Sequence, residues 1–133
     1  MSAFKALSLD KEERICSKKL IDDLFNGGGS HSISAYPLRA VYLYRKANSQ
    51  EDSPVSILVS VPKRCFKRAV KRNRVKRQIR EAYRRNKLGI REKTTSKNQI
   101  LALAFLWLDN KLCTSAEVEK KMKNLLERIS ESL

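Results

Sequence analysis

The longest apolar run in the chain, Ile100–Leu108, contains nine residues without a polar one among them. A strand with one face in solvent alternates apolar and polar residues, and this run does not alternate. It is also only about half as long as a membrane-spanning helix, which needs about 20 residues. The run therefore predicts a strand buried on both faces, central in a sheet around which the other elements are arranged.

Two segments earlier in the chain predict further strands, because both show a two-residue period. The segment Pro37–Arg45 has one apolar face, and Val55–Val61 alternates valine and isoleucine with serine and leucine. The polar stretch Ala47–Ser53 between them is expected to be a hairpin loop, and Ser32–Tyr36 is compatible with one more strand. The residues expected on one face of the first strand are Leu38, Ala40, Tyr42 and Tyr44.

Two of the three expected helices flank these strands. Residues 1–16 predict an extended arm, and Ser17 can cap a first helix that the run Gly27–Gly29 ends. That glycine run lacks the Lys and Ser/Thr of a phosphate-binding loop. The last helix begins at a capping box formed by Thr114 and Glu117. The apolar stripes are Leu20, Ile21, Leu24 and Phe25 in the first helix, and Val118, Met122, Leu125, Leu126 and Ile129 in the last.

A strongly basic segment lies between the second and the central strand. From Lys63 to Lys93 there are fifteen Lys or Arg against two Glu, a net charge of +13, and the whole chain carries +15. An excess of this size indicates an acidic partner, for which nucleic acid is the usual candidate. Pro62 ends the preceding strand, so a helix is expected from about Lys67 to Gly89, followed by a polar linker, Glu92–Asn98.

This basic helix is two-sided. Four residues, Val75, Ile79, Ala82 and Tyr83, share an arc of roughly 100° that can dock on a sheet. The opposite side carries Asn73, Lys76, Arg77, Arg80 and Arg84, which can follow phosphates along a folded RNA or a duplex. With the order α-β-β-α-β-α and 133 residues, the chain predicts one α+β domain, a two-layer sandwich over residues 1–133.

The segment 69–82, AVKRNRVKRQIREA, closely resembles the "RNR" motif of the bacterial ribonuclease P protein component. The stretch Ser60–Arg64 resembles the strand end and basic pair that precede the motif in that family. The resemblance implies a four-stranded mixed sheet packed by helices, as in a domain of one ribosomal protein, with a left-handed βαβ crossover. It also implies a cytoplasmic subunit of an endonuclease that removes the 5′ leader from precursor tRNA, with the catalytic centre and Mg²⁺ held mainly by an RNA subunit.

The resemblance also implies site residues and partners. The partners would be the catalytic RNA and precursor tRNA, with no membrane and no obligate protein partner. A cleft for the leader would have Tyr42 as its floor, with Tyr44 nearby and Phe25 on one wall, because aromatic rings stack on any base. The residues expected to bind RNA are Lys63, Arg64, Arg68, Arg72, Asn73, Arg74, Lys76, Arg77, Arg80 and Arg84.

No catalytic group or metal site is expected on this chain. The one histidine, His31, lies in a Gly/Ser-rich stretch typical of a loop, and the acids form no pair in an apolar setting. The cysteines Cys16, Cys65 and Cys113 are odd in number and far apart, so they predict neither disulfides nor zinc ligands but small, reduced core residues of a cytosolic protein without a signal peptide.

Two other classes of nucleic-acid-binding protein also carry a basic segment of this kind. A plain RNA-binding module, such as a ribosomal protein of similar build, shares the charge and the core but has no need for an aromatic cleft. A zipper-type DNA-binding region also places Asn among arginines, but it needs leucine heptads directly after the basic segment. Here Gly89 and polar residues follow, which excludes the zipper type.

Overall fold

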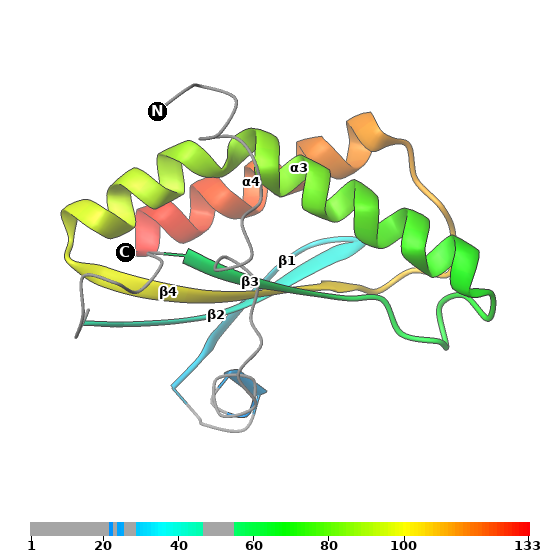
Figure 1. The fold of residues 1–133 in the computed structure, drawn as a ribbon, viewed down its shortest axis with the longest axis horizontal. Helices are drawn as coiled ribbons and strands as arrows, with labels where there is room; N and C mark the ends of the chain where they lie inside the picture. Colours follow the sequence, from blue (N-terminus) through cyan, green and yellow to red (C-terminus); the bar gives the residue numbers. More distant parts are fainter. Residues whose placement is uncertain (1–21, 23, 26–28, 47–54) are drawn as a thin grey trace.

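The computed structural model describes residues 22, 24, 25, 29–46 and 55–133, and it has a four-stranded sheet with two helices on one face (Figure 1). The sheet order is β1-β2-β4-β3. The predicted arm, the Ser17 cap, Ile21, Cys16, most of the glycine run and the hairpin loop lie outside the described residues. The bounds are β1 His31–Ala35, β2 Leu38–Lys46, β3 Val55–Ser60, α3 Ala69–Ser96, β4 Gln99–Trp107 and α4 Ser115–Ser132.

The apolar run forms β4, and its predicted central position is confirmed. β4 pairs antiparallel with β2 and parallel with β3, so the sheet is mixed. Leu103 and Phe105 are buried under the helices, and Ala102 and Ala104 are buried on the opposite face. A strand with both faces covered has no solvent side, which explains why the run lacks polar alternation.

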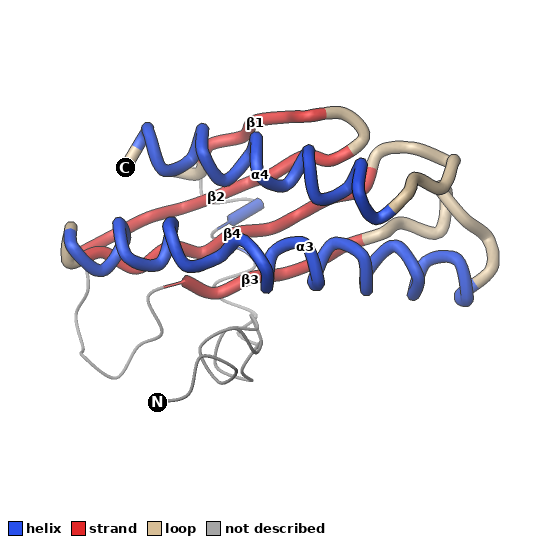
Figure 2. The backbone as a smooth tube through the Cα atoms, turned by 90° about the horizontal axis from the view of Figure 1, so that it is seen from above, coloured by secondary structure: helices blue, strands red, loops and turns tan. Residues whose placement is uncertain are grey.

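The unit β3-α3-β4 is a parallel crossover of unusual hand. Figure 2 looks at the sheet from the helix side, with α3 returning in front of the two strands that it joins. When the strands are turned to point upward in this view, β4 lies to the left of β3, so the crossover is left-handed. Crossovers of this kind are almost always right-handed. The handedness implied by the resemblance is therefore confirmed.

Helix α3 is longer than the sequence pattern predicts. It runs through Gly89 and the expected linker to Ser96, 28 residues in all. The stop at Gly89 is wrong because the buried stripe continues beyond it, with Ile90 and Thr94 against the core. At its other end, residues 69–74 contribute no buried side chain, and this part of α3 extends past the strand ends (Figure 1).

Gly89→Ala is expected to stabilise the protein by about 1 kcal/mol, because glycine is a poor residue for an exposed helix interior. Gly89 is exposed, and a Cβ added there would meet no atom within 4 Å. Urea unfolding followed by circular dichroism measures the change. Gly29→Ala, at a position outside any helix, should give no comparable gain, and an unchanged midpoint for Gly89→Ala would contradict the assignment of a continuous helix.

Helix α4 begins where the capping box predicts. The Thr114 hydroxyl accepts a hydrogen bond from the backbone N–H of Glu117, 3.2 Å away. All five residues of the predicted stripe are buried and pack with the helix-covered face of the sheet. Cys65 is buried in the same core, as expected of a small apolar residue. Within the described part of the chain, no helix has the length and apolar character needed to cross a membrane.

Candidate nucleic-acid interface

Exposed cations form a dense surface over the start of α3 and the loop before it. Residues 63–80 include no acid, and Asn73 is exposed among the cations. The N-cap residue, Arg68, makes no side-chain capping bond, and the first turn of α3 has no acidic residue. The partial positive charge of the helix start therefore adds to the side-chain charges. We call this the basic surface; its exposed cations are Lys63, Arg64, Lys67, Arg68, Lys71, Arg74, Arg77 and Arg80.

Three of the residues predicted to bind RNA, Arg72, Lys76 and Arg84, are only partly exposed. Arg72 is used inside the protein: its Nη1 donates to the carbonyls of Phe66, 2.9 Å away, and Lys67, 2.8 Å away. Phe66 is itself buried in the core. Through these two hydrogen bonds, Arg72 joins the start of α3 to the loop that carries Lys63 and Arg64. It therefore helps to position the basic surface.

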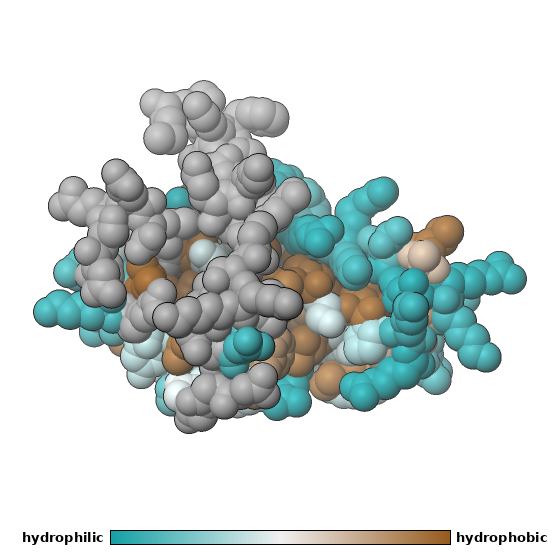
Figure 3. Space-filling view, turned by 60° about the horizontal axis from the view of Figure 1, so that its bottom comes forward, coloured by the Kyte–Doolittle hydropathy of each residue, from teal (hydrophilic) through white to brown (hydrophobic). Residues whose placement is uncertain are grey.

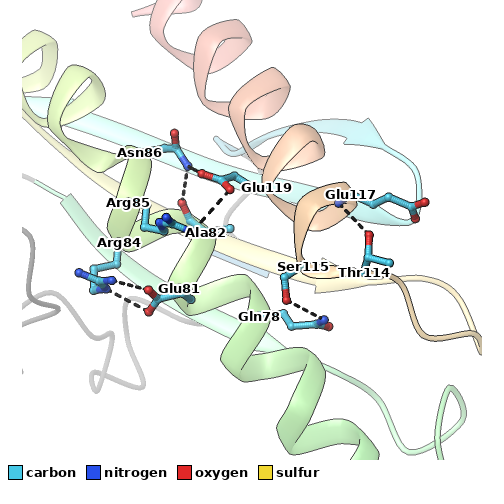
Figure 4. Close-up of polar contacts among 10 residues, drawn as sticks. All are labelled: Gln78, Glu81, Ala82, Arg84, Arg85, Asn86, Thr114, Ser115, Glu117 and Glu119. Carbon is cyan, nitrogen blue, oxygen red and sulfur yellow. Dashed lines mark hydrogen bonds and ion pairs between the residues drawn. The ribbon is translucent and has the colours of Figure 1, made fainter.

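Arg84 is paired with Glu81 on the side of α3 that faces away from α4 (Figure 4). The Arg84 Nε lies 3.0 Å from Glu81 Oε2, and a second guanidinium nitrogen bonds the other carboxylate oxygen. The hydrogen bonds from Arg84 lower the pKa of Glu81, so this acid remains ionised. The pair reduces the net charge at this turn, and the basic surface is most positive before it.

On its other side, α3 is held by α4 through polar contacts (Figure 4). Asn86 Nδ2 lies 3.4 Å from Glu119 Oε1, and Arg85 Nη1 lies 3.8 Å from Glu119 Oε2. Nearer the start of α4, Gln78 Nε2 donates to the carbonyl of Cys113, 3.0 Å away. These contacts, together with the shared apolar core, fix the direction in which α3 presents its cations.

The sheet face turned away from α3 and α4, here called the lower face, has an apolar centre. Leu24 is fully buried against Val41 and Ala104. Three leucines of the same cluster are only partly buried: Leu43, Leu58 and Leu106. Figure 3 shows apolar surface on this side, with hydrophilic side chains next to it. Phe25 follows Leu24 and is 44% exposed, so an aromatic ring is available beside this apolar surface.

The structure corrects the predicted cleft. Tyr42 is only 5% exposed and lies on the helix-covered face, where its hydroxyl is 3.0 Å from Ser132 Oγ of α4. Since Ser132 donates its own proton to the carbonyl of Ile129, the Tyr42 hydroxyl is the donor. The sheet therefore separates Tyr42 from Leu24 and from the short helical segment to which Leu24 and Phe25 belong, drawn in blue below the sheet in Figure 1. A cleft with Tyr42 as its floor and Phe25 on its wall is wrong.

Tyr44 and His31 also differ from expectation. Tyr44 is on the same face as Tyr42, and its ring stacks on His31, with centroids 5.6 Å apart. His31 is the first residue of β1 rather than a loop residue, and it also contacts Tyr42. The apolar residues of β2 that face downward are Val41 and Leu43. The alternation in the sequence separates them from the tyrosines, which share their face with Leu38 and Ala40.

The described residues contain no group of three or more His, Cys, Asp or Glu that could hold a metal ion. Glu81, the acid in the middle of α3, is already bonded to Arg84. Mg²⁺ prefers several oxygen ligands in octahedral geometry. The donor set found on the basic surface, guanidinium and ammonium groups with one amide, does not fit this ion.

Comparison with known proteins shows similarity to one family over nearly the whole chain. A family model described as Ribonuclease P matches residues 9–130. The chain is similar to the ribonuclease P protein component of Porphyromonas gingivalis in two strains, with 37% identity over 130 residues, 98% of this chain and 92% of each relative.

Solved structures show the same fold at lower sequence identity. The RNase P protein of Staphylococcus aureus superposes with a TM-score of 0.66 at 19% identity, covering 88% of this chain and 94% of that one. A mutant of the S. aureus protein with defective mRNA degradation activity gives a TM-score of 0.68 at 18% identity, covering 97% and 98%. The matching architecture includes the four-stranded mixed sheet with its two helices.

Proposed function

The chain belongs to the ribonuclease P protein family, and from this premise we propose that it binds the catalytic RNA through the basic surface and the 5′ leader of precursor tRNA on the lower face. As a protein component of ribonuclease P, it would assist Mg²⁺-dependent endonucleolytic removal of the leader. This cleavage forms the mature 5′ end of the tRNA. The chain would contribute binding and orientation, and the RNA subunit would contribute the reacting centre.

The observation that carries the proposal is the composition of the basic surface, which has eight exposed cations and no acid within residues 63–80. Such a surface binds phosphates and releases their counterions, which gives affinity without sequence preference. Asn73 adds an amide that can donate to and accept from base edges or sugars. A folded RNA with closely spaced phosphates is the partner that this arrangement fits best.

The lower face suits a single strand. Leu43 and Leu58 offer apolar contact, and the exposed ring of Phe25 can stack on a base of any identity. At the edge of the same face Arg39 is exposed, with its Nε bonded to Ser32 Oγ at 2.7 Å, and can meet a phosphate. A leader of variable sequence requires this kind of tolerant binding, in which stacking and charge replace base readout.

Catalysis is assigned to the RNA partner because the described histidine and the acid in the middle of α3 already have partners. His31 stacks on Tyr44 and also contacts Tyr42, and Glu81 is paired with Arg84. Neither is placed beside a second acid or base in a manner that supports proton transfer to and from a phosphodiester. The Mg²⁺ ions that the reaction uses would accordingly be held by RNA, and this chain would act on the geometry of the bound leader.

Phe25→Ala is expected to weaken binding of precursor tRNA to the assembled holoenzyme by ~1–3 kcal/mol, the scale of one lost stack on an aromatic ring. Binding of mature tRNA, which has no leader, should be nearly unchanged. Equilibrium binding of both tRNA forms to holoenzyme reconstituted with the RNA subunit measures the difference.

Leu88→Ala is the matched control for this variant. Leu88 is 45% exposed, close to the 44% of Phe25, but lies on α3. Its truncation should change neither affinity. Equal losses of precursor and mature tRNA on truncation of Phe25 would reject the leader site and leave a general RNA-binding protein. Cleavage of precursor tRNA by protein freed of RNA would reject the assignment of catalysis to the RNA.

A further inference from the structure

A cavity of about 340 Å³ lies at the end of the sheet, between the β1–β2 turn, the end of β4 and the first turns of α4. Leu38, Trp107 and Val118 form its inner part, and all three belong to the helix-covered core. The cavity is therefore on the side of the sheet opposite to the lower face. Its volume lies at the small end of the range for ligand sites, suited to a single nucleotide.

The outer wall of the cavity is aromatic and held in place. Tyr36 is 60% exposed, so one side of its ring is available to a planar ligand. The turn that carries it is fixed to β4, because the Leu108 N–H donates to the Pro37 carbonyl 2.9 Å away. Partial desolvation and the neighbouring Asp109 carboxylate raise the pKa of Tyr36, so its hydroxyl stays protonated. A base entering the cavity would stack on a ring that is already oriented.

One polar group in the wall distinguishes among bases, and one buried indole reports on what fills the cavity. Trp107 is 1% exposed, and its Nε1–H, which is itself buried, has no hydrogen-bond partner among the described residues. Because Trp107 lines the cavity, its indole signal is sensitive to a ligand that enters. Glu117 contributes a carboxylate. Burial and the neighbouring Glu117 carboxylate raise the pKa of Cys113, so the thiol stays neutral.

Guanine offers the complementary set of groups. Its N1–H and N2–H₂ are adjacent donors, and one carboxylate can accept from both. Adenine would place the acceptor N1 against the carboxylate, and cytosine has a single amino group. The preference for guanine follows from the presence of the Glu117 carboxylate in this small cavity.

Positively charged side chains lie at the rim of the cavity and between the cavity and the basic surface. Lys120 and Lys121 lie three and four residues after Glu117, on the same side of α4, and can hold a phosphate. Gln78 of α3 reaches the loop beside the cavity through Cys113 and Ser115, at 3.0 and 3.3 Å. Arg74 and Lys71, four and seven residues before Gln78, lie on the same side of α3. Phosphates on these cations would direct an RNA strand toward the cavity.

We infer that this cavity binds one unpaired guanosine nucleotide of the RNA held on the basic surface. The base stacks on Tyr36, its Watson–Crick edge meets Glu117, and its phosphate lies against Lys120 and Lys121. The choice of RNA as the ligand rests on the proposed function. It adds a contact that depends on base identity to a surface that otherwise reads only phosphates.

The indole N–H of Trp107 allows a direct test, because Trp107 is the only tryptophan in the chain and gives one resolved NMR signal. Titration with guanosine 5′-monophosphate should shift this signal, and adenosine 5′-monophosphate should need at least about tenfold more ligand. A short RNA hairpin with one unpaired guanosine should give the same shift at a concentration lower by about two orders of magnitude, since phosphate contacts add affinity.

Variants separate the contributions. Tyr36→Ala should weaken guanosine monophosphate binding about tenfold, whereas Tyr36→Phe, which keeps the ring, should bind like the parent. Lys120→Ala should weaken binding, and Lys123→Ala, on the same helix but outside the cavity wall, should not. Glu117→Gln should remove the preference for guanine over adenine. Arg74→Ala should weaken the hairpin and leave the mononucleotide unaffected.

Other outcomes would overturn the inference. A Trp107 signal that moves equally with inorganic phosphate would mean an anion site without base recognition, and a signal unmoved by any nucleotide would mean no site. Tighter binding of the mononucleotide than of the hairpin would point to a free nucleotide instead of RNA. If Phe25→Ala has no selective effect on precursor tRNA while the Trp107 signal still responds to guanosine monophosphate, the proposed function is rejected and the guanosine site is retained.

Discussion

Raising the salt concentration from about 50 to about 200 mM should lower the affinity for ribonuclease P RNA about a thousandfold, as expected when six or more phosphates are neutralised. The basic surface has eight exposed cations from which these contacts can be drawn. Each contact releases counterion, so log K should fall with log salt by ~0.7–0.9 per contact. Filter binding or fluorescence anisotropy over a salt series measures the slope.

Arg80→Ala should reduce this slope by about one contact and weaken binding to RNAs of different sequence to the same extent. Arg80 is exposed on α3, and Lys123 is an exposed cation on α4. Lys123→Ala therefore serves as the control, with an unchanged slope. Salt-independent affinity, or equal effects of the two substitutions, would contradict a binding mode built on the start of α3.

Tyr42→Ala should lower the free energy of unfolding by about 3–5 kcal/mol, the cost of removing a large aromatic side chain from a core. Tyr42 is 5% exposed between the sheet and α4, and its hydroxyl is bonded to Ser132. Tyr42→Phe removes only this bond and should cost about 1 kcal/mol. Urea unfolding of both variants measures the two contributions.

The milder variant also tests the corrected position of the leader site. Tyr42→Phe remains folded, and it should bind precursor and mature tRNA as the parent protein does. A selective loss of precursor binding in Tyr42→Phe would return this tyrosine to the leader site. A small effect of Tyr42→Ala on unfolding would show that the ring is not part of the core.

Elements with a strong local pattern were predictable from sequence. β4 was recognisable because both of its faces are apolar, and α4 because Thr114 caps it and its stripe is regular. The exposed positions of Asn73, Arg77 and Arg80 followed from helical periodicity on one side of α3. In each case the pattern that encodes the element lies within the element itself, so no tertiary information was required.

Features that depend on tertiary packing were not predictable in the same way. Gly89 suggests a helix end, but the helix continues through it because Ile90 and Thr94 are buried beyond it. The loss of helix stability that glycine causes is confined to this one position. Two-residue alternation separates the faces of β2 without saying which face the helices cover. The choice between Tyr42 and Val41 as cleft residues depended on that missing fact. The guanosine cavity joins three separate segments and has no local signature.

The part of α3 that extends past the sheet has a consequence for how the protein adapts to its partner. Opening of residues 69–74 would expose no buried apolar side chain, so its free-energy cost is set by helical hydrogen bonds and the two bonds donated by Arg72. The rest of α3 can remain folded during such an opening because its stripe begins at Val75. The first turn and a half can therefore adjust to the contour of an RNA independently of global unfolding, and the affinity includes the entropy of ordering it.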